Sequence, residues 1–404
     1  RIVCRVVNSL IDFLLTILFV VSCLLVIYNH VGYPALLSWY SKQHPFKTIN
    51  HRSRGFKSIK GDRACATITI LVPAFNEEQW IADKIRNLSS LDYPKNKYKV
   101  IIACDGCTDN TVSIAEQTIQ EAICSDTHFE IRAFESNRGK VAVVNEQMKT
   151  ITSDITALSD VSALISIDAL WVANKHFHNE QVGVVNGHYQ LFKPGNEGEA
   201  CYWQYQSKLK MREATLGSTL GAHGAFYLFR THLFESMSAD TINDDFIIPM
   251  SIVRQGYVAE YEPQMVALEM EATNEKDDFS RRLRISAGNM QQAIELCEMF
   301  LPKYKGVAFA FFSGKGLRLI TPYLLIFCLI SSIVMMDNPL FMAALIAQIA
   351  LYSLAVLSHQ LPYIFSHKAC KLLLYIVAGH CANFIGGMRY LFGLESGKWS
   401  RVGQ

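Results

Sequence analysis

The sequence predicts an α/β domain with a mainly parallel sheet, flanked at both ends by membrane-spanning helices. Two observations support this fold class. Short β-rich runs alternate with segments of helical spacing across residues 64–300. The two ends are strongly apolar, and they raise the mean hydropathy of the 404 residues to +0.16 although 18% are charged. The net charge of +2 gives no indication of nucleic-acid binding.

The N-terminal region, residues 1–40, is predicted to hold the first span at 9–31. This stretch contains one acid and is otherwise nearly all apolar or small, and about 20 such residues cross a bilayer. A signal peptide would have a shorter apolar core followed by a small-residue cleavage site, which the sequence lacks. Two basic residues precede the span, and seven follow it: Lys42, Lys47, Arg52, Arg54, Lys57, Lys60 and Arg63. The positive-inside rule therefore places the middle region in the cytoplasm.

The C-terminal region, residues 319–404, is predicted to contain two or three membrane segments. Runs 319–336 and 340–357 are apolar and joined by a tight turn at Asp337, which predicts a hairpin. A third run, 372–393, carries polar residues. If it also spanned, the basic tail with Lys398 and Arg401 would lie outside, against the positive-inside rule. A re-entrant or interfacial third segment would remove that conflict, and the sequence leaves both arrangements open.

Residues 301–318 form a separate predicted element. They mix lysines and an arginine with an aromatic cluster, which is the composition of an amphipathic helix in the headgroup layer. A helix packed on the soluble domain has the same pattern and remains an alternative.

The middle region has the order of a parallel sheet. Predicted strands are 67–75, 99–105, 130–135, 155–160 and 182–191, with helical segments at 81–91 and 111–123 between the early ones. Ligands of such sheets bind beyond the carboxyl ends of the strands. The eleven cysteines are irregularly spaced and indicate reduced thiols, and the Cys104–Cys107 pair lacks the second pair that a zinc site needs.

Chemically interesting side chains follow several of these predicted strands. Pro73, Ala74 and Glu77 lie in PAFNEE after the first strand, and Asp105 ends the second. Each acid could instead cap the following helix. Lys140 follows a glycine and precedes a helix. At this position it could bind a phosphate, but it could equally be exposed to solvent. Asp160, with a hydroxyl at Ser162, could hold a divalent ion against a diphosphate.

Two later groups complete the set. Asp244 and Asp245 precede a helix, where one could serve as a general base or both could simply favour the helix N-terminus. Arg281 and Arg284 lie at i and i+3 on one helix face and could clamp a departing diphosphate.

In this order the residues resemble the membrane-bound branch of the family-2 inverting glycosyltransferases, which includes chitin, cellulose, hyaluronan and poly-N-acetylglucosamine synthases. The resemblance covers about residues 67–320. PAFNEE matches the nucleoside-binding opening of the family, and GAHGAFYLFR (221–230) resembles its segment at the sugar and acceptor. The resemblance implies a GT-A fold, which is Rossmann-like, with flanking transmembrane helices.

The resemblance also implies a role for each matched residue. Pro73, Ala74 and Glu77 would hold the nucleoside, Asp105 the uridine, and Lys140 the diphosphate. Asp160 matches the first acid of the D-x-D metal motif, which implies Mg²⁺ or Mn²⁺. Asp245 matches the base that takes the acceptor proton, with Asp244 beside it. Arg281 and Arg284 match the first and fourth positions of Q-x-x-R-W.

Three residues depart from the family pattern. Ser162 replaces the second acid of D-x-D, and Asp244 replaces a glutamate. Ile285 stands where the family has a tryptophan that borders the acceptor sugar, and an aliphatic side chain cannot stack on a sugar ring in that way. This last change calls long-chain polymerisation into question but leaves transferase chemistry intact.

The implied function is an inverting transferase in polysaccharide or glycan synthesis. It would move a hexose or N-acetylhexosamine from a UDP-sugar to a glycan or lipid-linked acceptor. The expected location is the inner or plasma membrane, with several spans, contact with membrane lipids and a cytoplasmic catalytic domain. Two alternatives remain: a transferase that adds one sugar to a lipid carrier, and a catalytically silent partner in a polysaccharide export complex.

Overall fold

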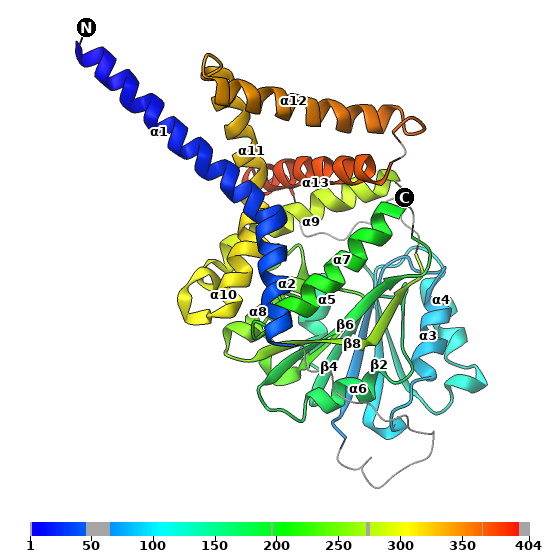
Figure 1. Ribbon diagram of the computed structural model, residues 1–404. Coiled ribbons are helices and arrows are strands. Elements are labelled where there is room, and N and C mark those ends of the chain that lie inside the picture. The colour runs from blue at the N-terminus through cyan, green and yellow to red at the C-terminus, as the bar shows by residue number, and fades with distance from the viewer. Residues whose placement is uncertain (1, 46–64, 195–196, 272–274, 366, 396–404) are drawn as a thin grey trace.

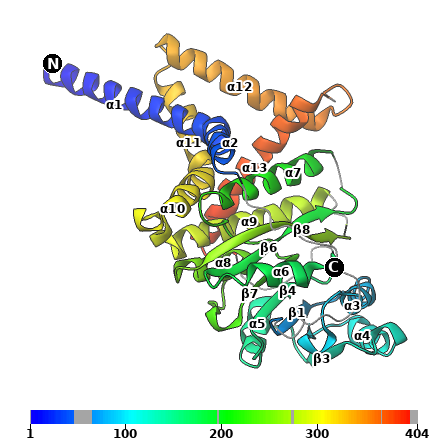
Figure 2. The same cartoon turned by 60° about the horizontal axis from the view of Figure 1, so that its bottom comes forward.

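The computed structural model describes residues 2–45, 65–194, 197–271, 275–365 and 367–395. Its centre is one eight-stranded sheet of order β3-β2-β1-β4-β7-β6-β8-β5 (Figures 1 and 2). The strands are β1 (Ile68–Ala74), β2 (Tyr98–Asp105), β3 (His128–Phe134), β4 (Ile155–Ser159), β5 (Ala163–Ile165), β6 (Val182–Leu191), β7 (Phe226–Arg230) and β8 (Val258–Glu269).

The sheet is mixed, although parallel pairing holds its first half together. Strands β1 to β4 pair in parallel, as the βα alternation predicts, whereas β7 runs antiparallel to β4 and β6, and β5 runs antiparallel to β8. The five strands expected from the sequence are present within a few residues of their predicted bounds. Strands β5, β7 and β8 were not expected, and each antiparallel pair among the described strands includes β5 or β7.

Alternating side chains of the central strands build a core on each face of the sheet. Ile68, Ile70 and Val72 of β1 face one cluster, and Leu71 of the same strand faces the other. Helices α3 (Ile81–Ser89), α4 (Thr111–Thr118) and α6 (Ala169–His176) cover the first cluster. Helices α5 (Lys140–Met148) and α8 (Asp244–Arg254) cover the second.

The remaining helices lie toward one end of the α/β domain (Figure 1). They are α1 (Ile2–Ile27), α2 (Tyr33–Gln43), α7 (Glu197–Ala214), α9 (Glu275–Glu295), α10 (Gly306–Ala310), α11 (Leu317–Val334), α12 (Pro339–Gln360) and α13 (Lys368–Leu391). A π-helical turn at Tyr28–Gly32 joins α1 to α2, and another at Phe311–Gly316 joins α10 to α11. The described residues contain four helices that are long and apolar enough to cross a membrane: 10–43, 306–334, α12 and α13.

The segment predicted as a separate interfacial helix, 301–318, is continuous with the first C-terminal apolar helix from Gly306 onward, and a 3-10 turn at Pro302–Tyr304 precedes it. Its side chain Phe311 is fully buried in the second core cluster, whereas Phe312 is exposed. One face of this segment therefore packs on the α/β domain, as in the alternative left open by the sequence. The exposed face keeps the apolar character that a headgroup-layer position needs.

The third C-terminal run forms one helix, α13, which lies along α9 (Figure 1). A Cβ on Gly386 would come within 2.5 Å of the Leu283 carbonyl oxygen, so glycine allows the two helices to touch. The Ser286 hydroxyl also donates to Asn383 across this contact, at 3.0 Å. The helix is thereby attached to the same helix that carries Arg281 and Arg284.

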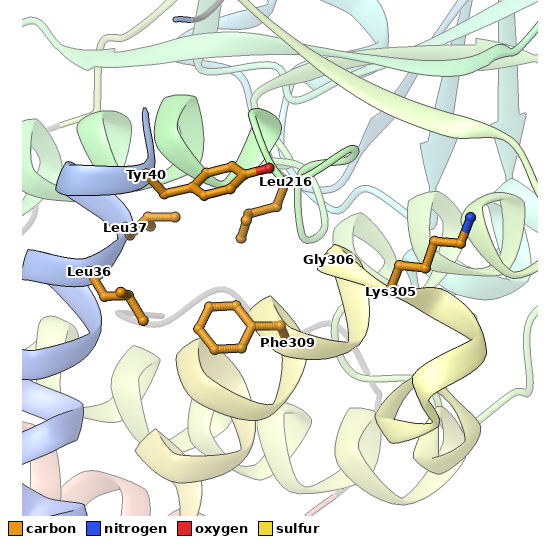
Figure 3. Close-up of a pocket in the computed structure, with 7 residues that line it drawn as sticks. All are labelled: Leu36, Leu37, Tyr40, Leu216, Lys305, Gly306 and Phe309. Carbon is orange, nitrogen blue, oxygen red and sulfur yellow. The ribbon is translucent and has the colours of Figure 1, made fainter. Parts of the chain in front are cut away.

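The turn at the foot of the N-terminal helix is fixed by polar contacts to the long apolar helix 306–334. The Tyr28 hydroxyl lies 3.0 Å from that of Ser313, and Asn29 donates to Thr321. Below them, α2 and α10 enclose an apolar pocket of about 520 Å³ (Figure 3), lined by Leu36, Leu37, Tyr40, Leu216, Lys305, Gly306 and Phe309. The basic segment expected after the first span, 47–63, and the tail with Lys398 and Arg401 lie outside the described residues.

Candidate active site

A cleft of about 680 Å³ opens at the carboxyl ends of β1, β4 and β8, beneath the membrane-proximal helices. Eight of the ten residues expected to form the site line it: Pro73, Glu77, Lys140, Asp160, Asp244, Asp245, Arg281 and Arg284. They come from the ends of β1 and β4 and from the starts of α5 and α8, with α9 opposite. The fold therefore brings together groups that lie more than 200 residues apart in the sequence.

Lys140 is the centre of the charged cluster. Its Nζ lies 3.0 Å from Asp160 Oδ1 and 3.2 Å from Asp244 Oδ2. Burial lowers the pKa of Lys140, but Asp160, Asp244 and Asp245 outweigh burial and raise it. The ammonium group therefore stays charged and holds two carboxylates in place at once.

Asp245 has the environment of a general base. Burial, together with repulsion from Asp244, raises the pKa of Asp245 to about 6, although Lys140 acts in the opposite direction. Its Oδ2 accepts a hydrogen bond from the backbone N–H of Gly224 at 3.1 Å, and its backbone oxygen accepts one from Ala222 at 2.8 Å. A carboxylate with a pKa near neutrality is suited to accept a proton from a hydroxyl.

Asp105 and Ala74 are fully buried and do not line the cleft. The Asp105 carboxylate accepts hydrogen bonds from the backbone N–H groups of Arg138 and Gly139, at 2.9 and 2.8 Å. Gly139 has φ of +92°, a conformation that favours glycine, and α5 begins at the next residue. As placed, Asp105 positions the turn that presents Lys140, and its contact with a uridine stays a prediction.

Two side chains of α3 hold the segment that carries Asp160. The fully buried Lys84 donates to the Ser159 hydroxyl at 2.6 Å and to the Ala163 carbonyl oxygen. One turn later, Asn87 exchanges two hydrogen bonds of 2.9 Å with the backbone of Ile165. The loop between β4 and β5 is thus attached on both sides of Asp160, which fixes the direction of its carboxylate.

Arg281 faces an aromatic group in the cleft wall. The His223 ring stacks on that of Tyr189 at a centroid distance of 3.7 Å, and Trp203 lies 5.1 Å from His223. Burial lowers the pKa of Arg281, but interaction with Tyr189, Glu269 and Asp160 raises it. Of the aromatic side chains near the substituted tryptophan position, Trp203 lines the cleft together with Ile285.

The donor set around Asp160 fits a metal held mainly by one carboxylate. Asp160 is 38% exposed, and a Cβ on Gly224 would meet its Oδ2 at 3.1 Å, so the glycine keeps this oxygen accessible. Ser162 hydrogen-bonds to Glu269, whose pKa burial raises. Among the described residues no group of three or more His, Cys, Asp or Glu side chains could hold a metal, so a diphosphate would have to supply further ligands.

Several contributors to the site were missed in the sequence. Lys84 had a visible signal, because it shares the apolar face of its helix with Ile81, Ile85 and Leu88, where a lysine must find a buried partner. Glu269 and Trp203 had none, because the pairing of β8 and the direction of α7 decide their places.

The sequence of this chain is similar to those of known proteins. The profile described as Glycosyltransferase like family 2 matches residues 66–288, more than half of the chain. The poly-beta-1,6-N-acetyl-D-glucosamine synthase of Staphylococcus aureus (strain COL) is 26% identical over 204 residues, 48% of each chain. Its counterpart from Staphylococcus epidermidis is 24% identical over 246 residues, 59% of this chain and 56% of the relative. The chain thus spans about half the length of the curated relatives it matches.

The fold itself is shared with a solved structure. A mannosyltransferase from Pyrobaculum calidifontis, in complex with GDP-Man and Mn²⁺, aligns with a TM-score of 0.67 and 22% identity. The alignment covers 91% of this chain and 99% of the other, so the likeness extends to the helices outside the α/β domain. With the sequence match and the cleft described above, it establishes a GT-A fold, and the chain belongs to glycosyltransferase family 2.

Proposed function

We propose that this glycosyltransferase moves a hexose or N-acetylhexosamine from a UDP-sugar to a lipid-linked or glycan acceptor, with inversion at the anomeric carbon. The observation that carries the proposal is Asp245, a partly buried carboxylate in the cleft with a pKa raised to about 6. The two curated relatives are poly-N-acetylglucosamine synthases, which supports a role in polysaccharide synthesis.

Asp245 would act on the acceptor. Its carboxylate takes the proton of the acceptor hydroxyl while the oxygen attacks the anomeric carbon directly. One displacement inverts that centre, so an α-linked donor yields a β-linked product. The hydrogen bond from Gly224 N–H, at 3.1 Å, fixes the carboxylate orientation for this step.

Mg²⁺ or Mn²⁺ would be held by Asp160 and would supply charge neutralisation to the diphosphate. Arg281 and Arg284 lie on one face of α9 and border the cleft, and Lys140 lies across from them. These three cations would neutralise the charge that develops as UDP departs. Pro73 and Glu77 at the end of β1 would border the nucleoside.

The membrane arrangement follows from the same elements. We place the catalytic domain in the cytoplasm, with spans in the segments 10–43 and 306–334 and in α12. Helix α13 lies along α9 and would occupy the interface rather than cross, because this leaves the basic tail on the cytoplasmic side. The cleft then opens next to the headgroups, where a lipid-linked acceptor would present its hydroxyl.

We expect a short product of one or a few sugars. Ile285 lacks the aromatic face that would help to hold a growing chain, and stacking on such a face contributes ~1 kcal/mol. Trp203 lines the same cleft and would be the aromatic side chain that replaces it. The Trp203 ring contacts Tyr189 and His223. If it also contacted the acceptor, a polymeric product would be favoured instead.

One assay tests donor, acceptor and product length together. The full chain, purified in membranes, is incubated with Mn²⁺ and a panel of UDP-sugars and GDP-mannose, and the products are analysed by mass and by anomeric coupling constants. We expect one UDP-sugar to be transferred in β-linkage onto a membrane lipid or a short glycan. Transfer from GDP-mannose alone would overturn the donor, and a high-molecular-weight polymer would overturn the short product.

A further inference from the structure

The cleft continues past Asp245 toward the foot of the membrane helices. Its far end is lined by Lys210 and Glu213 of α7 and by Lys315 and Arg318 at the junction of the π-turn with α11. None of these four residues has a place in the donor chemistry described above. They lie where a membrane-borne substrate would enter, because α11 continues from this point as a candidate span.

The two lysines have only neutral hydrogen-bond partners among the described residues. Lys210 Nζ donates to the carbonyl oxygens of Leu220, Gly221 and Ala222, at 3.1, 3.3 and 3.4 Å. Lys315 Nζ donates to Asn289 Oδ1 at 2.7 Å and lies 3.9 Å above the Phe246 ring. A carbonyl or an aromatic face orients an ammonium group but does not neutralise it.

The nearby carboxylate does not balance this charge. Glu213 is buried, and its Oε1 accepts a hydrogen bond from the Tyr33 hydroxyl at 3.0 Å. Burial raises the pKa of Glu213 to about 6, although Lys210, Arg318 and Lys315 all act to lower it. Burial also lowers the pKa of Lys210. Burial likewise lowers the pKa of Lys315, to about 7. An anion placed among these cations would favour the charged form of both lysines.

The position of this cluster ties it to the acceptor rather than to the donor. Lys315 lies on the ring of Phe246, the residue directly after the proposed base. Lys210 holds the loop that ends at Ala222, whose N–H donates to the backbone oxygen of Asp245 at 2.8 Å. The donor cations, by contrast, gather around Asp160 and on α9. An anion between Lys210 and Lys315 would therefore lie on the membrane side of the base.

We propose that Lys210, Lys315 and Arg318 form a subsite for the phosphate group of a lipid acceptor. The inference rests on the proposed function, since it names the acceptor class of the same cleft. The phosphate would supply the anionic hydrogen-bond partner that the two lysines do not have among the described residues, and the lipid chain would extend along α11. A hydroxyl group carried on the same lipid acceptor would then lie within reach of Asp245, which takes its proton as the oxygen attacks.

The test measures binding, and therefore does not depend on turnover. The detergent-purified full chain is titrated by calorimetry with farnesyl phosphate, farnesol, short-chain phosphatidylglycerol and inorganic phosphate, each with UDP and Mn²⁺ at saturation. We expect farnesyl phosphate to bind at least tenfold more tightly than the other three. Lys315→Met and Lys210→Met should each weaken it about tenfold, the loss of one charge-assisted hydrogen bond, and leave UDP affinity unchanged.

A matched control is Lys303→Met, which removes an exposed lysine of the same segment and should leave farnesyl phosphate binding unchanged. Equal affinity for farnesol would overturn the phosphate subsite, and equal affinity for phosphatidylglycerol would assign it to bilayer headgroups instead. The titration is repeated without UDP, and farnesyl phosphate that binds only in the absence of UDP would assign the cations to the donor. Binding of farnesyl phosphate by a wild type that does not bind UDP would count against the proposed function alone.

Discussion

Lys140 shows how one residue organises the chemistry of the cleft. Its ammonium group contacts Asp160 and Asp244 and lies close enough to Asp245 to oppose the rise in the pKa of that group. Three carboxylates at one place would repel each other strongly without such a cation. Asp160, the most exposed carboxylate contacting Lys140, remains accessible for a metal beside the donor.

The metal role of Asp160 is directly testable. Because Ser162 replaces the second acid, Asp160→Ala should remove the main protein ligand and abolish transfer. EDTA should do the same to the wild type, and Mn²⁺ should restore the wild type but not the variant. Asp126→Ala, at an exposed loop position, is the control and should keep full activity. Undiminished turnover of the wild type in excess EDTA would contradict this role.

At the residue scale, the order of motifs in the sequence predicted most of the cleft. Eight of ten expected residues line it, because strand ends and helix starts of an α/β fold converge at one edge. Asp105 was placed at the right edge, but its burial beneath the 137–139 turn depends on backbone geometry that no motif encodes. The lysine cluster at the far end had no motif at all, since α7 and α11 meet only in the fold.

Helix α3 connects the core to the loop that carries Asp160. Among the described residues, Lys84 donates to Ser159 and Ala163 and to no carboxylate, and burial lowers its pKa to about 7. Its position on the apolar face of the helix means that removal of the ammonium leaves two buried acceptors unsatisfied. The cost of one such group is about 1–3 kcal/mol.

We therefore expect Lys84→Met to loosen the Asp160 loop. The variant should require several-fold more Mn²⁺ for half-maximal transfer, and electron paramagnetic resonance should show weaker Mn²⁺ binding in the presence of UDP. Lys149→Met, at an exposed position after α5, is the control. A variant that is less stable but has unaltered Mn²⁺ affinity would limit Lys84 to a purely structural role.

The contact between α6 and β8 predicts a pH-dependent stability. Burial lowers the pKa of His176, but hydrogen bonds to Glu260 and Glu262 outweigh burial and raise it to about 9 from 6.5. A raised folded-state pKa stabilises the fold fully below pH 6.5, and this is lost as pH rises through 9. The full effect is about 3 kcal/mol.

Thermal unfolding of the detergent-purified chain at pH 6.5 and 9.5 measures this contribution. The Tm of the wild type should fall further over that interval than the Tm of His176→Gln, because the variant has no imidazolium charge to lose. Equal losses in the two proteins would show that the histidine is neutral in the folded state.

Sequence patterns predicted five of the strands but not β5, β7 and β8. The five expected strands have β-rich runs bounded by turns, whereas β5 has only three residues and β8 contains Pro263, which weakens its pattern. Strand β7 lay in a segment interpreted as part of the sugar site. Antiparallel pairing in the second half of the sheet depends on these three strands and could not be predicted.

At the scale of the whole molecule, the four long apolar helices lie to one side of the catalytic domain (Figure 1). Their hydropathy was readable from the sequence, but the packing of α13 along α9 was not, because it depends on close contact at Gly386. This packing favours an interfacial place for α13. Three crossings would then leave the catalytic domain and the C-terminal tail on the same side.

Cysteine labelling in intact cells tests this topology. In a background without the exposed Cys297 and Cys381, a cysteine placed within 51–63 should be shielded from an impermeant thiol reagent, and one beside Asp337 should be labelled. Permeabilised cells supply the control, in which both sites should react. Labelling of the 51–63 site from outside would invert the topology and separate the cleft from cytoplasmic UDP-sugars.

We propose above that Asp245 is the base of a sugar transfer in this cleft. A comparison of the wild type with the Asp245→Asn variant tests this role. Single-turnover transfer from the preferred UDP-sugar and UDP affinity are measured in the same preparations of wild type and Asp245→Asn. We predict that the variant transfers sugar ~10²–10⁴-fold more slowly than the wild type, which is the range for loss of a general base, and that its UDP affinity is nearly unchanged. Near-normal turnover of the variant would contradict it, because Asp245 would then serve only the start of α8.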